Sequence, residues 1–375
     1  MSGRIFLFGA TGYTGRITAE LLTVGGAAPV LVGRSRTDVE KLAEDLAPLA
    51  PGGRPPSSAV ADAERPKTLR GLLSDQDDVL VSTVGPFARY GRPAVETVID
   101  YGAAYVDCTA EPTFIREVFE DQGRRAQRTG ARLLPGMGLD YAPGNLAAAL
   151  LLDRLAETPH RIDVGYLVTG PYTPSSGSVG TVGAMLLDPS FGYHDGNLVS
   201  QRPGAHVRSF PVHGELQDAL SIGGTEQFTV PRLAPAVKDV NVYVGWTGRW
   251  SRAASAAGIV ASNARSVPGV GSAMSIVMRA ALGGASNNGP AAHQRRKCRS
   301  VIIAEGYNES GEQLGRVTLD GPNPYDLTAA LLSWSARMLA RRAEKAVGSL
   351  GPIGAFGLDA FLGGCTAIDL VEIEQ

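Results

Sequence analysis

The chain is poor in cysteine, and the few cysteines that it has are far apart. Cys108, Cys298 and Cys365 are the only three among 375 residues, and no two of them have the spacing of zinc ligands or of a redox pair. This usage predicts a reduced, cytoplasmic protein. The five histidines form no HxH or HExxH pair, so we expect no metal site.

An excess of charge of one sign and long apolar runs are missing as well. The chain has 35 basic and 37 acidic side chains, and its net charge of −2 offers no attraction for a nucleic-acid backbone. No run of about 18 apolar residues occurs, so we expect no membrane span. A strand is expected from Ile5 onward, which leaves no room for a secretory signal peptide. The remaining composition, 44% hydrophobic and 19% charged, is that of a globular protein.

The N-terminal part of the chain alternates short apolar runs with amphipathic stretches. Short, fully apolar runs are typical of parallel strands that helices cover on both faces. The clearest helix is expected over Pro112–Thr129, with Gly130 just past its last turn. The expected strands are Ile5–Ala10, Val30–Gly33, Ala59–Asp62, Val79–Gly85, Ala104–Thr109 and Arg132–Pro135. Six strands with intervening helices predict a doubly wound parallel sheet of the Rossmann type.

The pattern changes after about residue 155. Alternating apolar and polar residues with turn signals predict a second, α+β domain with a mostly antiparallel sheet. Its expected strands are Ile162–Thr169, Val207–Val212, Cys298–Tyr307 and Gly315–Leu319. Residues 252–289 are rich in Ala, Ser and Gly, and we interpret them as a surface cover, either a helix pair or a loop. An amphipathic helix is expected over Pro324–Val347. The predicted class is α/β.

A glycine-rich motif at the start of the chain carries the strongest functional signal. In RIFLFGATGYTGR, Gly9, Gly12 and Gly15 follow an apolar strand and open a helix. Glycine is needed there for a tight turn, for backbone N–H groups to approach a diphosphate, and for close packing of helix on strand. The N-terminus of such a helix favours an anion. The alternative is a glycine-rich turn without a ligand, which the strand-before, helix-after context disfavours.

The end of the second expected strand indicates which dinucleotide binds. An NAD site carries an Asp or Glu there, whereas this chain has Gly33, Arg34, Ser35 and Arg36, with no carboxylate before Asp38. Two guanidinium groups suit the 2′-phosphate of NADP(H) through charge-assisted hydrogen bonds. The alternative is a pair of solvated surface arginines.

Other strand ends supply further candidates, because ligands bind at the carboxyl edge of a parallel sheet. Thr83, Val84, Gly85 and Pro86 follow one strand, and they form either a ligand-binding or a purely structural turn. Asp107 ends another, where it either bonds the cofactor or caps the next helix.

Two tyrosines in the loops expected near the nicotinamide are candidate proton donors. Tyr90 follows the Gly85-Pro86 turn, and Tyr141 lies in PGMGLDYAPGN, a loop that either covers the nicotinamide or only links the domains. A phenol can deliver a proton to a developing carbanion or amide. Water in place of the phenols, and ordinary loop tyrosines, are the open alternatives.

These motifs together resemble those of the saccharopine dehydrogenase-like oxidoreductases, a family that includes the trans-acting enoyl reductases of actinobacterial lipid biosynthesis. The matching segments are GATGYTG, VGRSR, STVGPFARYG, YVDCTAEP, the GLD of GMGLDYAPG, SSGSVGT and DGPNPYDLTAALLSWSARMLA. The resemblance spans most of the chain and is densest up to Asn145.

The resemblance implies three segments: an NADP-binding Rossmann domain over 1–145, a substrate and dimerisation domain over 146–322, and C-terminal helices over 323–375 that return to the first domain. It also implies a homodimer, and a cleft between the domains where substrate meets the nicotinamide. The cofactor contacts that it implies are Thr11, Gly12, Tyr13, Thr14, Arg34, Ser35, Arg36, Asp62, Thr83, Val84, Gly85, Pro86, Asp107, Leu139 and Asp140.

The functional hypothesis is an NADPH-dependent reductase that transfers hydride to a C=C or C=N bond of a small or carrier-tethered biosynthetic intermediate. One alternative is an NADP-dependent amine dehydrogenase that works in the oxidative direction. A second is a non-catalytic regulator that binds NADP(H), because a fold alone does not establish catalysis. The identity of the substrate is not encoded in these motifs.

Overall fold

The computed structural model describes residues 3–175, 188–245, 289–341 and 346–374. The chain divides into two compact units, each described by itself below. The first unit comprises Met1–Thr109, Phe114–Gly138 and Tyr325–Gly357, and the second comprises Ala110–Thr113, Leu139–Pro324 and Leu358–Gln375. Both units are therefore built from segments that are separated in the sequence.

The first unit is built on a seven-stranded sheet in which every pair of neighbours is parallel. The strand order is β15-β6-β5-β4-β1-β2-β3. The strands are β1 Ile5–Phe8, β2 Val30–Gly33, β3 Ser57–Val60, β4 Val79–Ser82, β5 Ala104–Asp107, β6 Arg132–Leu134 and β15 Gly348–Ser349. The predicted Rossmann-type parallel sheet is confirmed.

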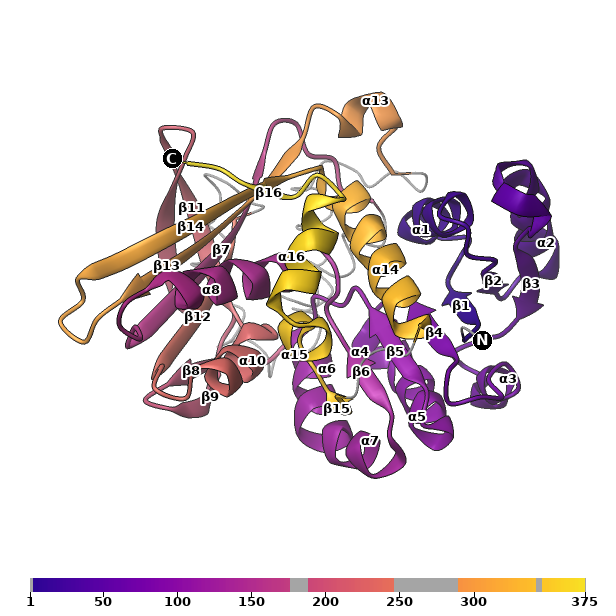
Figure 1. Ribbon diagram of the computed structural model, residues 1–375, viewed down its shortest axis with the longest axis horizontal. Coiled ribbons are helices and arrows are strands. Elements are labelled where there is room, and N and C mark those ends of the chain that lie inside the picture. The colour runs from indigo at the N-terminus through magenta and orange to yellow at the C-terminus, as the bar shows by residue number, and fades with distance from the viewer. Residues whose placement is uncertain (1–2, 176–187, 246–288, 342–345, 375) are drawn as a thin grey trace, which may run out of the picture. The chain divides into compact units, whose positions relative to one another are not determined.

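Helices cover both faces of this sheet. Phe6, Leu80 and Tyr105 point to the face that packs against α5 and α7. The residues next to them within each strand point to the other face of the sheet. Figure 1 shows α1 and α14 on one side of the strands and α3, α5 and α7 on the other. The helices are α1 Tyr13–Val24, α2 Arg36–Leu46, α3 Pro66–Arg70, α4 Phe87–Tyr90, α5 Arg92–Tyr101, α7 Gly123–Thr129, α14 Pro324–Ala340 and α15 Pro352–Phe356.

Several boundaries differ from the expectation. Four of the expected strands end one to three residues early, because the chain turns away as soon as it leaves the sheet. The strand expected at Ala59–Asp62 lies at Ser57–Val60, an edge position where the apolar pattern is weak. The helix expected over Pro324–Val347 ends at Ala340, and residues 342–345 lie outside the described residues.

The helix expected over Pro112–Thr129 forms, but a π-helical turn interrupts it. It consists of α6 Pro112–Glu117, the π-turn Val118–Gln122 and α7. The Ser349 hydroxyl of β15 donates a hydrogen bond of 2.6 Å to the Val118 carbonyl oxygen. A side chain that occupies a helical carbonyl in this way loosens the local i→i−4 ladder. Gly130 ends α7 in the left-handed conformation (φ 81°), as expected for a glycine past the last turn.

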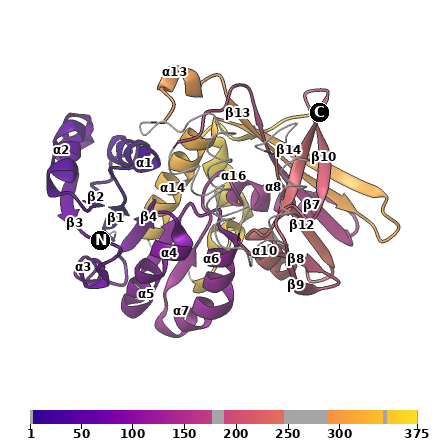
Figure 2. The ribbon, with the colours of Figure 1, turned by 180° about the vertical axis from the view of Figure 1, so that it is seen from behind.

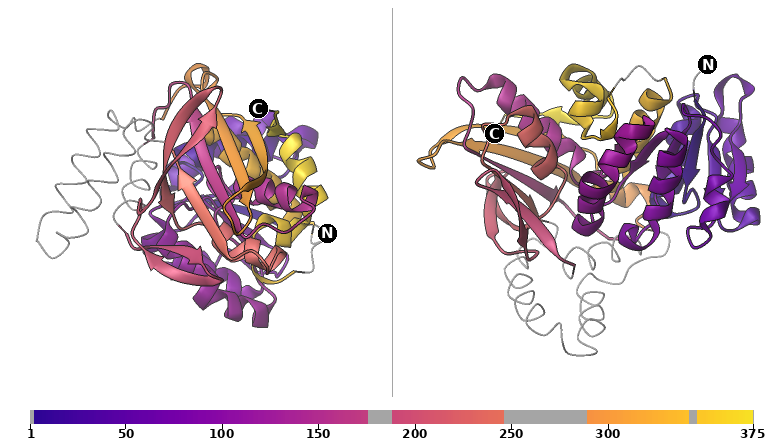
Figure 3. Two further views of the ribbon diagram at one scale, coloured as in Figure 1. Left: turned by 90° about the vertical axis from the view of Figure 1, so that its left-hand side faces the viewer. Right: turned by 90° about the horizontal axis from the view of Figure 1, so that it is seen from below.

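The described residues of the second unit form a nine-stranded sheet, and among these strands only β12 and β7 pair in parallel. The predicted mostly antiparallel sheet is confirmed. The strands are β7 Arg161–Thr169, β8 Ser190–His194, β9 Asn197–Gln201, β10 Val207–Val212, β11 Glu215–Ile222, β12 Asp239–Val244, β13 Arg299–Tyr307, β14 Gln313–Gly321 and β16 Val371–Glu372. The long strands β7, β13 and β14 run side by side (Figure 3).

Helix α8 Ala142–Arg154 forms the core of the second unit. It packs on β7, β13 and β14, and its other sides contact α10 Glu226–Leu233 and α16 Leu358–Thr366. Its residues from Ala142 to Leu151 are all buried, as expected for a helix that is apolar all round. Figure 2 shows α10 beside β8 and β12. A short helix, α13 Ala292–Arg295, precedes β13.

Two further observations concern the described residues only. None of their helices combines the length and the hydropathy that a membrane crossing requires. The segment 252–289, which we interpreted as a surface cover, lies outside the described residues except for Gly289.

Candidate active site

The loop between β1 and α1 has the backbone geometry that its three glycines predict. Gly9 has φ +88°, a conformation that side chains with a Cβ rarely adopt. Its amide and that of Ala10 donate to the Val32 carbonyl, at 2.9 and 3.2 Å. A Cβ on Gly15 would sit against the Gly9 carbonyl oxygen, closer than real Cβ contacts come. Glycine at these positions allows helix α1 to start directly over the strand end.

The N-terminus of α1 is electropositive. Gly12 caps the helix in an extended conformation without a side-chain hydrogen bond, and the first turn holds no acidic residue. The Arg16 guanidinium lies nearby and donates to the Thr11 carbonyl at 3.0 Å. The Tyr13 ring packs edge-on against the Tyr325 ring, with centroids 4.8 Å apart. The N–H groups and the positive end of the helix dipole can therefore hold an anion.

Both arginines after β2 are exposed to solvent. Ser35 caps α2, and its hydroxyl accepts a hydrogen bond of 3.4 Å from the Asp38 amide. The Arg36 guanidinium lies 3.5 Å from the Glu40 carboxylate, and 74% of its side chain is exposed. Such an exposed i,i+4 pair contributes only about 0.3–0.5 kcal/mol. The guanidinium groups of Arg34 and Arg36 are thus free to turn toward a phosphate.

Thr83 ties the end of β4 to the glycine loop. Its hydroxyl donates to the carbonyl oxygens of Phe8 and Gly9, at 3.3 and 3.1 Å. The chain then passes through Val84 and a cis Gly85-Pro86 peptide bond into α4.

The candidates Asp62 and Tyr90 lie in the turns beyond β3 and β4. Asp62 accepts the Glu64 amide at 3.0 Å, so its carboxylate already supports its own turn. Tyr90 is half-buried at the end of α4, and its hydroxyl lies 3.4 Å from the Glu64 carboxylate.

Asp107 joins the carboxyl ends of β5 and β6. Its side chain is buried and accepts the amides of Thr109 and Gly136, at 2.9 and 2.8 Å, and its carbonyl oxygen accepts the Met137 amide at 2.7 Å. The carboxylate therefore fixes the start of the loop that contains Leu139, Asp140 and Tyr141. The sequence left two roles open for Asp107, cofactor contact or helix cap, and these hydrogen bonds add a third, which is to hold this loop.

Tyr141 is buried within the second unit in a strained conformation. Its φ is +83°, an uncommon value for a residue other than glycine. Its hydroxyl lies 3.2 Å from the Ala110 carbonyl oxygen and 3.1 Å from that of Gly223, and burial raises its pKa well above 10. The phenol proposed as a proton donor thus directs its proton to the protein backbone.

Asp140, which the sequence placed at the cofactor, lies at the edge of a buried acid cluster in the second unit. The cluster consists of Asp140, Tyr141, Tyr166 and Glu226. The Tyr166 hydroxyl donates to the Glu226 carboxylate, and the Tyr166 and Tyr141 rings meet edge to face with centroids 6.1 Å apart. Burial raises the pKa of Glu226 to about 7, although hydrogen bonds from Tyr166 and Thr225 oppose the shift. Burial and the nearby Glu226 charge raise the pKa of Asp140 well above its usual range.

Asn145, Thr225 and Thr229 form a hydrogen-bonded group next to the acid cluster. The Asn145 amide group donates to the Tyr141 carbonyl at 2.8 Å and to the Thr225 hydroxyl at 2.9 Å, and Asn145 in turn accepts from Thr229. Sequence analysis missed Tyr166, Glu226 and this group, because they come from β7 and α10, far from the glycine motif. The only local signal is a Gly223-Gly224 pair just before Glu226. No group of three or more His, Cys, Asp or Glu side chains suited to a metal ion occurs among the residues described.

Comparisons with known proteins agree with this architecture. A trans-acting enoyl reductase of Mycobacterium leprae is 36% identical over 155 residues, which are 41% of this chain and 36% of that protein. A putative trans-acting enoyl reductase of Mycobacterium tuberculosis is 38% identical over 149 residues, which are 39% of this chain and 35% of that protein. The match thus spans about a third of the length of these curated relatives. No family model matches the chain.

A solved structure shows the same fold over nearly the whole chain. Apo saccharopine dehydrogenase (L-Glu forming) of Saccharomyces cerevisiae aligns over 99% of both chains with a TM-score of 0.61 and 12% sequence identity. The chain therefore shares the fold of that saccharopine dehydrogenase. The curated relatives of the matched segment are trans-acting enoyl reductases, so the resemblance predicted from the motifs is confirmed.

Proposed function

We propose that this protein is an NADP(H)-dependent oxidoreductase that transfers hydride to a C=C or C=N bond of a biosynthetic intermediate. The observation that carries the proposal is the glycine loop, with two exposed arginines after the neighbouring strand. The names of the curated relatives favour an enoyl C=C bond and a substrate tethered to a carrier, and the saccharopine dehydrogenase fold keeps the C=N bond in the proposal.

The residues of the first unit fit a dinucleotide with a 2′-phosphate. A Cβ on Gly9 would collide with Thr83 and Val84, and a Cβ on Gly15 would collide with the Gly9 carbonyl oxygen. Glycine at both positions therefore allows the tight loop on which a diphosphate would approach the amides of Tyr13 and Thr14. Arg34 and Arg36 would bind the 2′-phosphate, and Ser35 offers a hydroxyl. The other predicted contacts are Thr11, Gly12, Asp62, Thr83, Val84, Gly85, Pro86, Asp107, Leu139 and Asp140. The bound nicotinamide would supply the hydride.

We propose further that the first unit binds the cofactor and that the second unit binds the substrate and mediates homodimerisation in the cytoplasm. Sedimentation velocity of the purified protein measures the dimer directly. A single species at the monomer mass would exclude the homodimer and leave the cofactor proposal intact.

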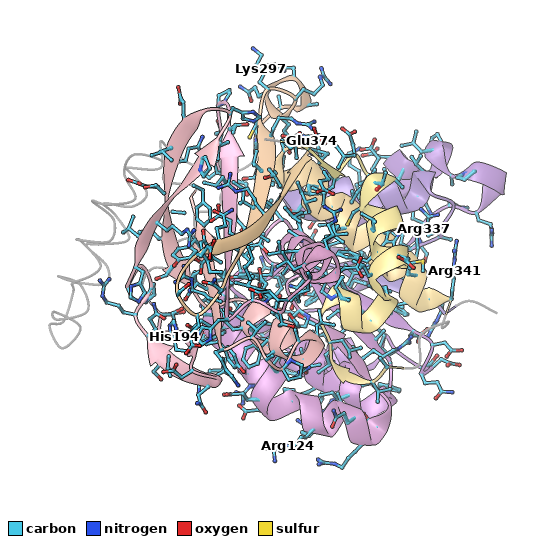
Figure 4. All side chains as sticks on the ribbon, turned by 60° about the vertical axis from the view of Figure 1, so that its left-hand side comes forward. Arg124, His194, Lys297, Arg337, Arg341 and Glu374 are labelled. Carbon is cyan, nitrogen blue, oxygen red and sulfur yellow. The ribbon has the colours of Figure 1, made fainter. Side chains whose placement is uncertain are left out.

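The test of the cofactor assignment is a fluorescence titration with NADPH and with NADH. Replacing Arg34 and Arg36 by Ala should weaken NADPH binding far more than NADH binding, since each charge-assisted contact contributes about 1.5–3 kcal/mol. One such contact corresponds to a factor of about ten or more in Kd. Arg124→Ala is the matched control, because Arg124 is exposed on α7 and projects into solvent (Figure 4). Equal losses for both dinucleotides would remove the 2′-phosphate assignment.

The reaction itself is tested with NADPH and two acceptor classes, an enoyl thioester such as crotonyl-coenzyme A and a cyclic imine. Consumption of NADPH with one class and not the other identifies the bond that is reduced. Turnover only with NADP⁺ and a secondary amine would favour the oxidative amine dehydrogenase. Saturable NADPH binding without turnover in either direction would favour a cofactor-binding regulator.

A further inference from the structure

The first unit holds a cation close to the glycine loop that the proposed function does not use. Arg16 is the fourth residue of α1, and its side chain is exposed to solvent. Glu20 follows one turn later, at the spacing of an i,i+4 ion pair. The Arg16 guanidinium instead turns back to the loop, where its Nε atom donates to the Thr11 carbonyl oxygen at 3.0 Å. Among the residues that the structure describes, no carboxylate pairs with Arg16.

The position of Arg16 is unfavourable for α1 itself. The N-terminal end of a helix carries a partial positive charge, so a cation beside it is repelled. The first turn of α1 has no acidic residue that would offset this repulsion. Residues that oppose a local preference in this way are expected mainly where a ligand compensates for them. An anion bound beside the start of α1 would do so, and we therefore interpret Arg16 as a residue of the cofactor site.

Thr11 connects Arg16 with the end of β2. A Cβ on Gly33, the last residue of β2, would lie 3.7 Å from the Thr11 Oγ1 atom and 3.8 Å from its Cγ2 atom. The Thr11 side chain therefore lies against the end of the strand, while its carbonyl oxygen accepts the Arg16 guanidinium. Arg34 follows Gly33 directly, and consecutive Cα atoms are about 3.8 Å apart. Thr11 thus lies between Arg16 and the residue that precedes Arg34.

The charges around the end of β2 favour an anion. Arg36 is the first residue of α2, and α2 lies beside α1 (Figure 1). The Arg36 guanidinium lies 3.5 Å from the Glu40 carboxylate, and Asp38 is in the first turn of the same helix. When Arg16 is counted with Arg34 and Arg36, these two carboxylates leave one positive charge unbalanced. A phosphate monoester, with about two negative charges and three acceptor oxygens, matches such a group of donors.

We propose that Arg16 binds the 2′-phosphate of the cofactor and determines, together with Arg34 and Arg36, the preference for NADP(H) over NAD(H). The inference rests on the proposed function, because it concerns the same cofactor. The Thr11 carbonyl oxygen holds the Nε side of the guanidinium, and the two terminal nitrogens remain to donate to phosphate oxygens. The planar guanidinium makes both kinds of contact at once, whereas the single ammonium of a lysine does not have this geometry.

The first experiment is a fluorescence titration of the full-length protein with NADPH and with NADH. Arg16→Ala should raise the Kd for NADPH by about 10- to 100-fold and change the Kd for NADH by no more than about twofold. Arg16→Lys should raise the Kd for NADPH by a smaller factor, because it keeps the charge and loses the fork of donors. Glu20→Gln, a change of an exposed residue one turn further along α1, is the matched control and should leave both Kd values unchanged.

The wild-type titration separates a failure of this inference from a failure of the proposed function. Wild-type protein that binds NADPH no more tightly than NADH would refute the proposed cofactor, and the inference about Arg16 with it. Wild-type protein that prefers NADPH, together with an Arg16→Ala variant that prefers it equally, would overturn the inference alone. An equal rise of both Kd values in Arg16→Ala would also overturn it, because Arg16 would then act on the diphosphate or on the shape of the loop.

The second experiment measures urea unfolding without nucleotide and distinguishes binding from a structural role. Because a cation near the start of α1 opposes the helix dipole, Arg16→Ala should unfold at the same urea concentration as wild type or at a higher one. If Arg16 served mainly to hold the Thr11 carbonyl, the variant would unfold at lower urea and both Kd values would rise together. That combination would contradict the proposal.

A third measurement tests whether Arg16 and Arg34 bind the same phosphate. The Kd for NADPH is compared among Arg16→Ala, Arg34→Ala and the double variant. Residues that share a binding partner do not act independently, so the factor for the double variant should differ from the product of the two single factors. A double variant whose factor equals that product would place the two arginines on separate groups of the cofactor, against the proposal.

Discussion

The close approach of α1 to β1 leads to a prediction for Gly15→Ala. The new Cβ would collide with the Gly9 carbonyl oxygen and lie 3.0 Å from the Ala10 Cα atom, and neither is a side chain that can rotate away. The helix must therefore move by about 1 Å, and overpacking of this kind costs about 1–3 kcal/mol. Alanine is better than glycine inside a helix by about 0.5–1 kcal/mol, which offsets part of the cost. We expect a net loss of about 1–2 kcal/mol in the free energy of unfolding.

Two further glycine-to-alanine changes separate stability from cofactor binding. A Cβ on Gly12 lies 3.2 Å from the Gly9 carbonyl oxygen, and this exposed residue has an extended conformation that alanine also adopts. Gly12→Ala should therefore fold nearly normally and yet bind NADPH more weakly, because the added methyl group would take up space at the start of α1, where we propose that the diphosphate binds. Gly354→Ala is the matched reference in α15, where a Cβ would meet nothing within 4 Å.

Urea unfolding and NADPH titration of the three variants give the readout. Gly15→Ala should lower the unfolding midpoint, Gly12→Ala should raise the Kd for NADPH, and Gly354→Ala should do neither. A Gly15→Ala protein with wild-type stability would show that helix and strand do not approach as closely as described. A Gly12→Ala protein with wild-type affinity would show that the diphosphate does not lie on this loop.

Two more predictions concern the acid cluster. Because burial raises the pKa of Glu226 to about 7, the folded protein binds more protons than the unfolded chain between its ordinary value of 4.5 and about 7. This contribution to stability is complete below about pH 4.5 and is lost as the pH rises through about 7. Between pH 5 and 7.5, urea unfolding should therefore show a smaller loss of unfolding free energy in Glu226→Gln than in wild type. Equal losses in the two proteins would contradict the pKa shift of Glu226. Gly144→Ala should destabilise the protein by about 1–3 kcal/mol, and combining it with Tyr166→Phe should recover part of that loss, whereas strictly additive effects would show that the two residues do not touch.

Local sequence patterns predicted most of the first unit. The strand at Val30–Gly33 has the expected bounds, and the glycine loop has the expected turn. Short apolar runs and glycines determine the conformation of the few residues around them, so a local sequence pattern is enough to predict both. The two-residue strand β15 was not predicted, since it carries no periodicity and exists only by pairing with β6. The π-turn at Val118–Gln122 was also missed, and the hydrogen bond that its Val118 carbonyl oxygen accepts comes from Ser349, far away in the sequence.

In the second unit, local patterns found the long strands and missed the short or polar ones. β8, β9, β11 and β12 were not expected. β9 (NLVSQ) and β11 (ELQDALSI) lack a regular alternation, whereas β12 (DVNVYV) has one that was missed. Their pairing with one another and with β7 compensates for weak local preference, since β propensity depends strongly on neighbours.

The sequence by itself determined the parallel sheet, the glycine loop and the arginines after β2, because each depends on residues close together in the chain. Only the tertiary structure decided which acids lie together. Asp140 and Glu226 are 86 positions apart. The packing of α8, α10 and β7 buries Glu226 with Tyr166 and leaves Asp140 half-buried beside them. The protonation of such groups depends on solvent exclusion and nearby charge, and the order of residues along the chain encodes neither directly.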